Sequence, residues 1–278
     1  MITKARLVIL LSSVFATILP LSPAMWAQSA GFLGFDSNEY PGDASLKALR
    51  QTFSYAGYWL NNPPGESANT WIGHRPAVES AGFGFLVLFN GRLYAELKTV
   101  ERAARLGHTD AERAVAAARR EGFPPATIIF LDQEQGGRML PEQKAYIYAW
   151  VDGVAAAGFR TGVYCSGMPA PTKDRVVTAE DIRQNAAGRE IVYWVTNDAC
   201  PPAPGCACPQ HSPHPDQSGV PFAEVWQFAQ SPQRKDVAAH CTGYARDGNC
   251  YPAGVTAGRR YVDVDTATSP DPSHGRAQ

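Results

Sequence analysis

The sequence has no surplus of charge of either sign. Its 278 residues include 25 Lys and Arg against 26 Asp and Glu, a formal net charge of −1. Proteins that bind nucleic acid rely on a basic face that neutralises phosphates, so this balance gives no reason to expect a nucleic-acid partner. A mainly disordered chain is also excluded, because 45% of the residues are hydrophobic and 10% are aromatic.

Two common catalytic motifs are missing as well. The first apolar run, Phe32 to Asp36, is followed by Ser37-Asn38-Glu39-Tyr40, not by the Gly-rich loop that holds a phosphate in doubly wound sheets. No Gly-x-Ser-x-Gly sequence occurs, and Cys165-Ser166-Gly167 lacks the first glycine of that motif. These absences argue against a nucleotide-binding fold and against a serine hydrolase.

Only the N-terminus carries a long apolar run. Lys4 and Arg6 precede an apolar stretch from Leu7 to Leu21, and small residues follow it. A basic start, an apolar middle and a small-residue exit are typical of a secretory signal peptide, whereas a membrane span needs about 20 apolar residues. An uncleaved anchor is the alternative. We expect a leader over residues 1–27 and a secreted, periplasmic or cell-envelope protein with no stable membrane span after its removal.

Cysteine is absent from the N-terminal half. The six cysteines are Cys165, Cys200, Cys206, Cys208, Cys241 and Cys250. An even number in an exported chain favours disulfides, and all six are candidates. Cys241 and Cys250 bracket a short Gly/Asp/Asn-rich loop and are expected to pair. The Pro-rich segment 197–221 holds three cysteines and two histidines, but Cys-x-Cys is an unusual zinc spacing, so we expect neither a metal nor another cofactor.

Strand-like apolar runs alternate with helical segments along the rest of the chain. Thr127 to Leu131, for example, is an unbroken apolar run typical of a strand buried on both faces, and Thr109 to Arg120 is predicted as a helix opened by a capping box. The pattern predicts an α/β protein. About 250 residues suffice for a single (β/α)8 TIM-like barrel, regular or irregular, with the Cys/Pro-rich segment as a loop insertion. The barrel domain is expected over 28–266, followed by a flexible tail, 267–278.

Acidic and amide side chains stand where four apolar strands are predicted to finish. The four segments are Phe35-Asp36, Leu131-Asp132-Gln133-Glu134, Trp226-Gln227-Phe228 and Val262-Asp263-Val264-Asp265. In a barrel the carboxyl ends of the strands meet at one face, so these groups are expected in one bowl. Asp132 and Glu134 would point the same way on an extended strand, about 7 Å apart. Such a carboxylate pair suits glycoside hydrolysis, although any single Asp there can instead cap a helix.

Aromatic residues near these strand ends are candidates for stacking on sugar rings. The substrate-binding candidates are Tyr58, Tyr164, Trp194, Trp226 and the amide of Gln227. Ordinary core packing is the alternative for at least half of the aromatics.

These motifs, together with Gly162-Val163-Tyr164-Cys165-Ser166, resemble in their order the lysozymes of glycoside hydrolase family 25. The sequence is still more similar to an exported glycoside-hydrolase-like domain of unknown function that is related to them, over about Gly31 to Thr266. The resemblance implies a muramidase-like hydrolase of cell-wall polysaccharide, a peptidoglycan-type β-1,4 glycan. It also implies an acidic cluster of Asp36, Asp132, Glu134 and Asp263. In that cluster Glu134 would be the general acid/base, and Asp132 would orient the substrate's N-acetyl group for attack on the anomeric carbon.

The sequence departs from the family 25 pattern at two places. Asn38-Glu39-Tyr40-Pro41-Gly42 replaces the usual Gln-Gly after the first strand, and the third strand ends in Phe89-Asn90-Gly91 instead of an aromatic–His pair. A catalytically weak or inactive barrel that binds cell-wall glycan is therefore the alternative function, and a metal-dependent exported hydrolase is a third. In each case we expect a monomer, with polysaccharide as the partner of the first two.

Overall fold

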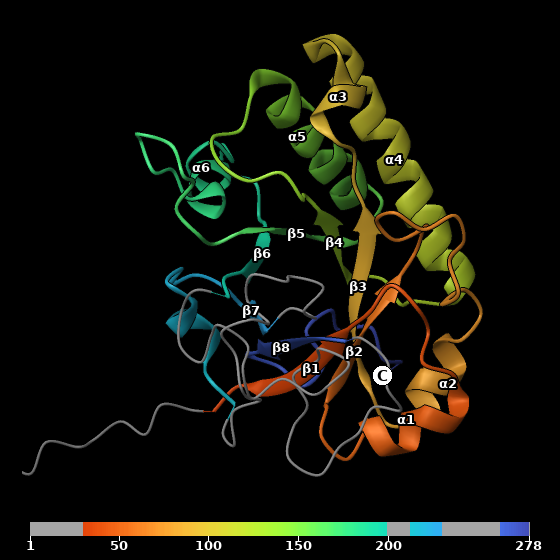
Figure 1. Ribbon diagram of the computed structural model, residues 1–278. Coiled ribbons are helices and arrows are strands. Elements are labelled where there is room, and N and C mark those ends of the chain that lie inside the picture. The colour runs from red at the N-terminus through yellow and green to blue at the C-terminus, as the bar shows by residue number, and fades with distance from the viewer. Residues whose placement is uncertain (1–29, 199–211, 230–261, 278) are drawn as a thin grey trace, which may run out of the picture.

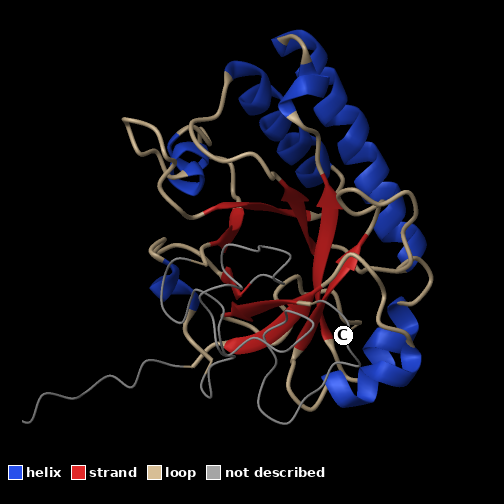
Figure 2. Cartoon of the chain, viewed as in Figure 1, coloured by secondary structure: helices blue, strands red, loops and turns tan. Residues whose placement is uncertain are grey.

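The structure, a computed structural model, describes residues 30–198, 212–229 and 262–277. Within these ranges eight strands close into one barrel in the order of the chain, and helices cover its outside (Figures 1 and 2). The elements are β1 (Phe32–Asp36), α1 (Asp43–Leu49), β2 (Tyr55–Trp59), α2 (Arg75–Ser80), β3 (Gly84–Asn90), α3 (Tyr94–Leu97), α4 (Val100–Glu121), β4 (Ile128–Asp132), α5 (Pro141–Ala156), β5 (Arg160–Ser166), α6 (Thr178–Gln184), β6 (Val192–Thr196), the 3-10 helix η1 (Pro215–Ser218), β7 (Val225–Ala229) and β8 (Asp263–Ala267).

The predicted α/β barrel is confirmed, and its irregularity lies at the last strand. Strands β1 to β7 pair in parallel, whereas β8 runs antiparallel to both β7 and β1. The segment Val262-Asp263-Val264-Asp265 is predicted to lie where a strand finishes, but β8 begins at Asp263 and continues to Ala267. Because β8 is reversed, its first residue lies at the edge where the parallel strands end. Asp263 therefore still reaches the mouth of the barrel.

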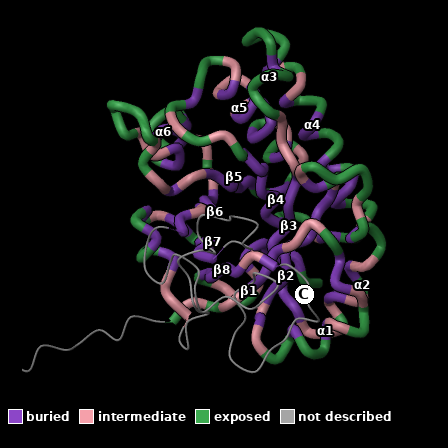
Figure 3. Tube along the Cα trace, in the orientation of Figure 1, coloured by how far each residue is buried: buried purple, intermediate pink, exposed green. Residues whose placement is uncertain are grey.

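Strands β2, β3 and β4 are buried on both faces, as their unbroken apolar sequences require (Figure 3). Helices α4 and α5 lie side by side against the outside of this part of the barrel (Figure 1). Helix α4 ends at Glu121, one residue after the predicted Arg120, and the left-handed Gly122 caps it, but it begins at Val100 with Thr99 as its N-cap. The start predicted at Thr109 is wrong, because buried positions such as Ala103 and Gly107 continue the apolar face upstream.

The C-terminal residues are not a flexible tail, and this prediction is corrected. Asp271 Oδ1 accepts a hydrogen bond of 2.8 Å from the Phe85 backbone N–H, and Ser273 Oγ accepts one of 2.8 Å from Val87. The Ser273 carbonyl accepts a further bond from the Ile128 N–H. The polar residues that suggested a flexible tail supply the acceptors for backbone N–H groups in the first half of β3 and at the start of β4.

The predicted leader, the middle of the Cys/Pro-rich insertion and five of the six cysteines lie outside the described residues. Among the helices of the described ranges, none has the length and apolar character needed to cross a membrane.

Candidate active site

Three of the four predicted acids stand at one edge of the barrel. Asp36 is the last residue of β1 and is paired in register with Asp263, the first residue of β8. Asp132 is the last residue of β4, where its neighbours in register are Asn90 on β3 and Tyr164 on β5. The parallel strands β1 and β4 and the reversed β8 thus place the carboxylates of Asp36, Asp132 and Asp263 at the same mouth, from opposite sides of the barrel.

Gln227 on β7 links two of these carboxylates. Its Nε2 donates hydrogen bonds to Asp36 Oδ2 at 2.8 Å and to Asp263 Oδ2 at 3.2 Å. Its Oε1 accepts a bond of 2.7 Å from the Tyr164 hydroxyl. The amide therefore lies at the centre of the mouth, and its two ends have different partners.

Asp36 is buried, with 7% of its surface exposed. Burial, together with the negative charge of Glu134, raises its pKa from 3.8 to about 6, although the hydrogen bond from Gln227 acts in the opposite direction. Gly57 on the adjacent β2 makes room for this side chain, since a Cβ there would lie 2.7 Å from Asp36 Cβ. A glycine in the middle of a buried strand is thus required by the close approach of Asp36.

Asp132 and Glu134 lie near one another but differ in exposure. Asp132 is buried, and its Oδ1 has no hydrogen-bond partner in the described part of the chain. Burial and then the charges of Glu134 and Asp36 raise its pKa well above the usual range. The expected placement of both acids on an extended strand is wrong, because β4 ends at Asp132 and Glu134 stands in the following loop. Glu134 is exposed, yet the surrounding protein excludes enough water to raise its pKa.

A fifth acid, Asp265, lies in one of the predicted strand-end segments but was left out of the expected acidic cluster. This residue is fully buried two positions along β8 from Asp263, and Trp194 Nε1 donates a 3.0 Å hydrogen bond to its Oδ1. Burial, then the charge of Asp36, raises its pKa well above the usual value. Tyr55 is the second missed residue: it is buried, and the charges of Asp265 and Asp36 raise its pKa further than burial alone. The two-residue spacing in β8 was the available signal, because alternate strand residues share a face.

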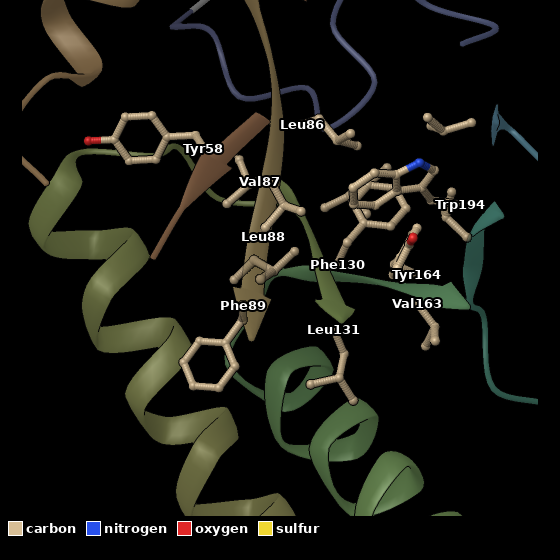
Figure 4. Packing of buried hydrophobic residues seen from close by; sticks show 14 of the residues in the cluster. Tyr58, Leu86, Val87, Leu88, Phe89, Phe130, Leu131, Val163, Tyr164 and Trp194 are labelled. Carbon is tan, nitrogen blue, oxygen red and sulfur yellow. The ribbon is translucent and has the colours of Figure 1, made fainter. Parts of the chain in front are cut away.

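Only two of the four aromatic candidates join the acids. Tyr164 contacts Gln227, and its ring centroid is 4.3 Å from that of Trp194. Tyr58 instead lies on the α4 side of the sheet, far from Tyr164 and Trp194 in Figure 4. Its hydroxyl donates to Glu121 at the end of α4.

Trp226 also stays out of the mouth. Its Nε1 donates to the Asn197 carbonyl at 3.0 Å, and its ring packs against Phe228. Because Gln227 faces the mouth, its direct neighbour on the strand must face the opposite side. The stacking roles predicted for Tyr58 and Trp226 are therefore corrected to core packing.

Cys165 is a free thiol, buried in β5. Burial raises the pKa of this thiol above its usual range, which lowers its reactivity. The prediction that Cys165 takes part in a disulfide is corrected accordingly. The other five candidates lie outside the described residues, as does most of the Cys/His segment; within the described ranges no three His, Cys, Asp or Glu side chains are arranged to hold a metal ion.

Residues 73–218 match the family of Rv2525c-like, glycoside hydrolase-like domains. The chain belongs to this family. The resemblance inferred from the sequence motifs is thereby confirmed for the glycoside-hydrolase-like domain. No curated protein matches the chain.

Solved structures share the family's barrel with this chain. An uncharacterized B. stearothermophilus protein is 21% identical, with 85% of this chain and 96% of that chain covered and a TM-score of 0.53. The Tat-secreted protein Rv2525c of Mycobacterium tuberculosis, in complex with L-tartrate, is 15% identical, with 88% and 98% covered and a TM-score of 0.52. The catalytic domain of endolysin ply40, from bacteriophage P40 of Listeria monocytogenes, is 14% identical, with 90% and 100% covered and a TM-score of 0.51. At these identities the likeness is one of fold.

Proposed function

We propose that the protein is an exported glycoside hydrolase that cleaves a peptidoglycan-type β-1,4 glycan by carboxylate acid/base catalysis. The observation that carries the proposal is that Asp36, Asp132 and Asp263 stand at one edge of the barrel, at the ends of β1 and β4 and the start of β8. The charge of Glu134, in the loop after β4, adds to the effect of burial in raising the pKa of both Asp36 and Asp132. Membership in the glycoside hydrolase-like family and the fold shared with an endolysin catalytic domain support the same reading.

Glu134 is suited to the role of general acid. Its raised pKa keeps more of it protonated near neutral pH than an ordinary glutamate, and its exposed carboxyl is accessible to a bound glycan. It donates its proton to the glycosidic oxygen as the bond to the anomeric carbon breaks. In the second step it takes a proton from the attacking water.

Asp132 is suited to orient the substrate's acetamido group. Its Oδ1 lacks a partner in the described residues, so it is available to accept the acetamido N–H while the carbonyl oxygen attacks the anomeric carbon. Asp36, with a pKa of about 6, is mostly ionised at neutral pH, and its negative charge stabilises the cation that forms there. The positive charge also favours ionisation of Asp132, so the site stabilises the transition state more than the ground state.

Release of reducing ends from purified peptidoglycan tests this function. Glu134→Gln should lower turnover by about 10² or more while glycan binding persists, because it removes only the proton donor. Asp132→Asn should lower turnover as well. The matched control is Glu112→Gln, an exposed site on α4, which should behave as the wild type.

Two outcomes would contradict the proposal. Turnover that survives both Glu134→Gln and Asp132→Asn would refute the assignment of these residues. Wild-type protein that is pulled down by peptidoglycan but releases no reducing ends would instead establish the catalytically inactive, glycan-binding barrel.

Export is the second part of the proposal. A leader over residues 1–27 and a barrel domain from residue 28 to 266 account for the basic and apolar N-terminus, and the structurally similar Rv2525c is described as Tat-secreted. N-terminal sequencing of protein from the envelope or medium should find a start between Met25 and Ala30. An intact Met1 on a membrane-extracted chain would support an anchor instead.

A further inference from the structure

A pocket of about 760 Å³ lies between α4 and the ends of β2 and β3. One wall is the face of α4 that carries Arg113, Ala116 and Arg120, and the other is formed by the loops that follow β2 and β3. Phe89, near the end of β3, points toward α4 in Figure 4 and belongs to the same lining. The acids of the candidate active site do not line this pocket. It includes the segment Phe89-Asn90-Gly91, at which the sequence departs from the family 25 pattern.

The described residues that line the pocket include three arginines against two acids, and both acids are already paired. Asp110 is buried and accepts hydrogen bonds from Arg92 Nη2 at 3.0 Å and from Arg113 Nη1 at 3.2 Å. Glu96 accepts one of 3.2 Å from Arg92 Nη1 and one of 2.9 Å from the Leu93 backbone N–H. The pocket therefore carries a surplus of positive charge that its own acids do not neutralise.

This surplus is concentrated on one face of α4. Arg113 and Arg120 are seven residues apart, so they share a face of the helix, and the small side chain of Ala116 stands between them. Arg113 uses only Nη1 for Asp110, and Arg120 has no hydrogen-bond or ion-pair partner among the described residues. A guanidinium has five N–H donors and no acceptor, so most of these donors are available to a ligand.

The facing wall is fixed by hydrogen bonds between the two loops. Asn61 Nδ2 donates to the Asn90 carbonyl at 3.0 Å, and Asn61 Oδ1 accepts a bond of 2.7 Å from the Asn90 backbone N–H. Asn90 Nδ2 in turn donates to the Asn62 carbonyl at 2.9 Å. The Asn62 side chain lines the pocket and contributes further N–H donors opposite the arginines. The pocket is thus formed before any ligand binds, which reduces the entropic cost of binding.

We propose that this pocket binds a phosphate group, held between the guanidinium groups of Arg113 and Arg120 on one wall and the amide of Asn62 on the other. Arginine forms charge-assisted, bidentate hydrogen bonds with both phosphate and carboxylate. Phosphate is favoured here because the donors come from two facing walls, and a tetrahedral phosphate presents its oxygens in more directions than a planar carboxylate. A phosphomonoester and a phosphodiester both carry this group. The site goes beyond the proposed hydrolysis and does not depend on it.

Calorimetric titration of the full-length protein with inorganic phosphate, at constant ionic strength, tests this site. Arg120→Gln removes a cation that has no partner in the described ranges, so the fold should persist. Ala116→Trp keeps every charge but fills the space between the two arginines, and it is tolerated because Ala116 is exposed. The matched control is Arg105→Gln, which removes a cation from an exposed position of α4 outside the pocket.

The wild type should bind phosphate saturably and acetate about tenfold more weakly. Arg120→Gln and Ala116→Trp should each weaken phosphate binding by about tenfold, whereas Arg105→Gln should bind as the wild type does. Glycerol phosphate and glycerophosphoglycerol distinguish the monoester from the diester, and tighter binding of either than of acetate supports the site.

Three outcomes would overturn the proposal. The first is the absence of saturable phosphate binding, and the second is acetate that binds as tightly as phosphate. The third is an equal affinity of Arg120→Gln and Arg105→Gln for phosphate, which would indicate diffuse attraction to the surface of α4. Glu134→Gln should bind phosphate as the wild type does, so a failure of the proposed hydrolysis would appear separately, as wild-type protein that releases no reducing ends.

Discussion

The Tyr164 hydroxyl donates a 2.7 Å hydrogen bond to Gln227 Oε1 and thereby decides which end of that amide faces the acids. With Oε1 occupied, Nε2 is directed to Asp36 and Asp263. A carboxylate accepts hydrogen bonds and cannot pair with the carbonyl end of an amide, so the opposite orientation would be repulsive. The Tyr164 hydroxyl on β5 therefore orients the amide that donates hydrogen bonds to both Asp36 on β1 and Asp263 on β8.

Tyr164→Phe should lower turnover while the fold persists. The ring still packs on Trp194, but the amide of Gln227 loses the contact that orients it, and a lost hydrogen bond of this kind lowers turnover by about tenfold. The matched control is Tyr58→Phe, the same chemical change at the α4 side of the sheet, where the hydroxyl donates a hydrogen bond to Glu121. The control should lower the melting temperature and leave turnover unaffected; equal losses of turnover in both variants would contradict the role of Tyr164.

Asp36 should make stability fall as the pH rises from about 4 to about 6. Its pKa is about 6 in the folded protein against 3.8 ordinarily, so the unfolded chain releases the proton first as the pH rises. The full cost, on the order of 3 kcal/mol, is present above the folded pKa and absent below the unfolded one. Asp36→Asn should therefore raise the melting temperature more at about pH 7 than at about pH 4. An equal gain at both pH values, or the same pattern in Glu112→Gln, would contradict this prediction.

Asp265 should behave as a neutral acid. Its burial and the adjacent charge of Asp36 raise its pKa well above the usual range, and asparagine has the shape of a protonated aspartate. Asp265→Asn should consequently keep the bond from Trp194 and nearly wild-type stability in urea unfolding. Asp265→Leu should cost about 1–3 kcal/mol, because it leaves the indole N–H buried without a partner. If Asp265→Asn lowered the free energy of unfolding as much as Asp265→Leu, Asp265 would have to be ionised in the folded protein.

Cys165 should resist alkylation in the native protein and react only after unfolding, because its thiol is buried with a raised pKa.

The other five cysteines are an odd number, so at least one of them has no disulfide partner within the chain. Peptide mapping without reduction should find the predicted Cys241–Cys250 bridge and a second bridge from Cys200, Cys206 or Cys208. A stoichiometric zinc ion with free thiols would refute both bridges.

Much of the architecture was predictable from local patterns. Apolar runs that alternate with helical segments are a property of the sequence itself, and so is the position of an acid directly after an apolar run. Asp36 and Asp132 could therefore be located before the structure, since any parallel barrel brings such residues to one edge. Alternation along β7 could also have excluded Trp226, because it is adjacent to Gln227 and cannot share its face.

Other features depended on contacts between distant segments. The direction of β8 is set by its pairing with β1 and β7, and the residue pattern within the strand does not indicate whether it runs parallel or antiparallel to them. The same holds for the docking of Asp271 and Ser273 under β3, where a polar sequence compatible with a loose tail meets free N–H donors. The sequence by itself determined which residue types stand at the strand ends. Only the tertiary structure decided which of them contact one another and which have raised pKa values, because hydrogen bonds, burial and charge effects depend on neighbours far apart in the chain.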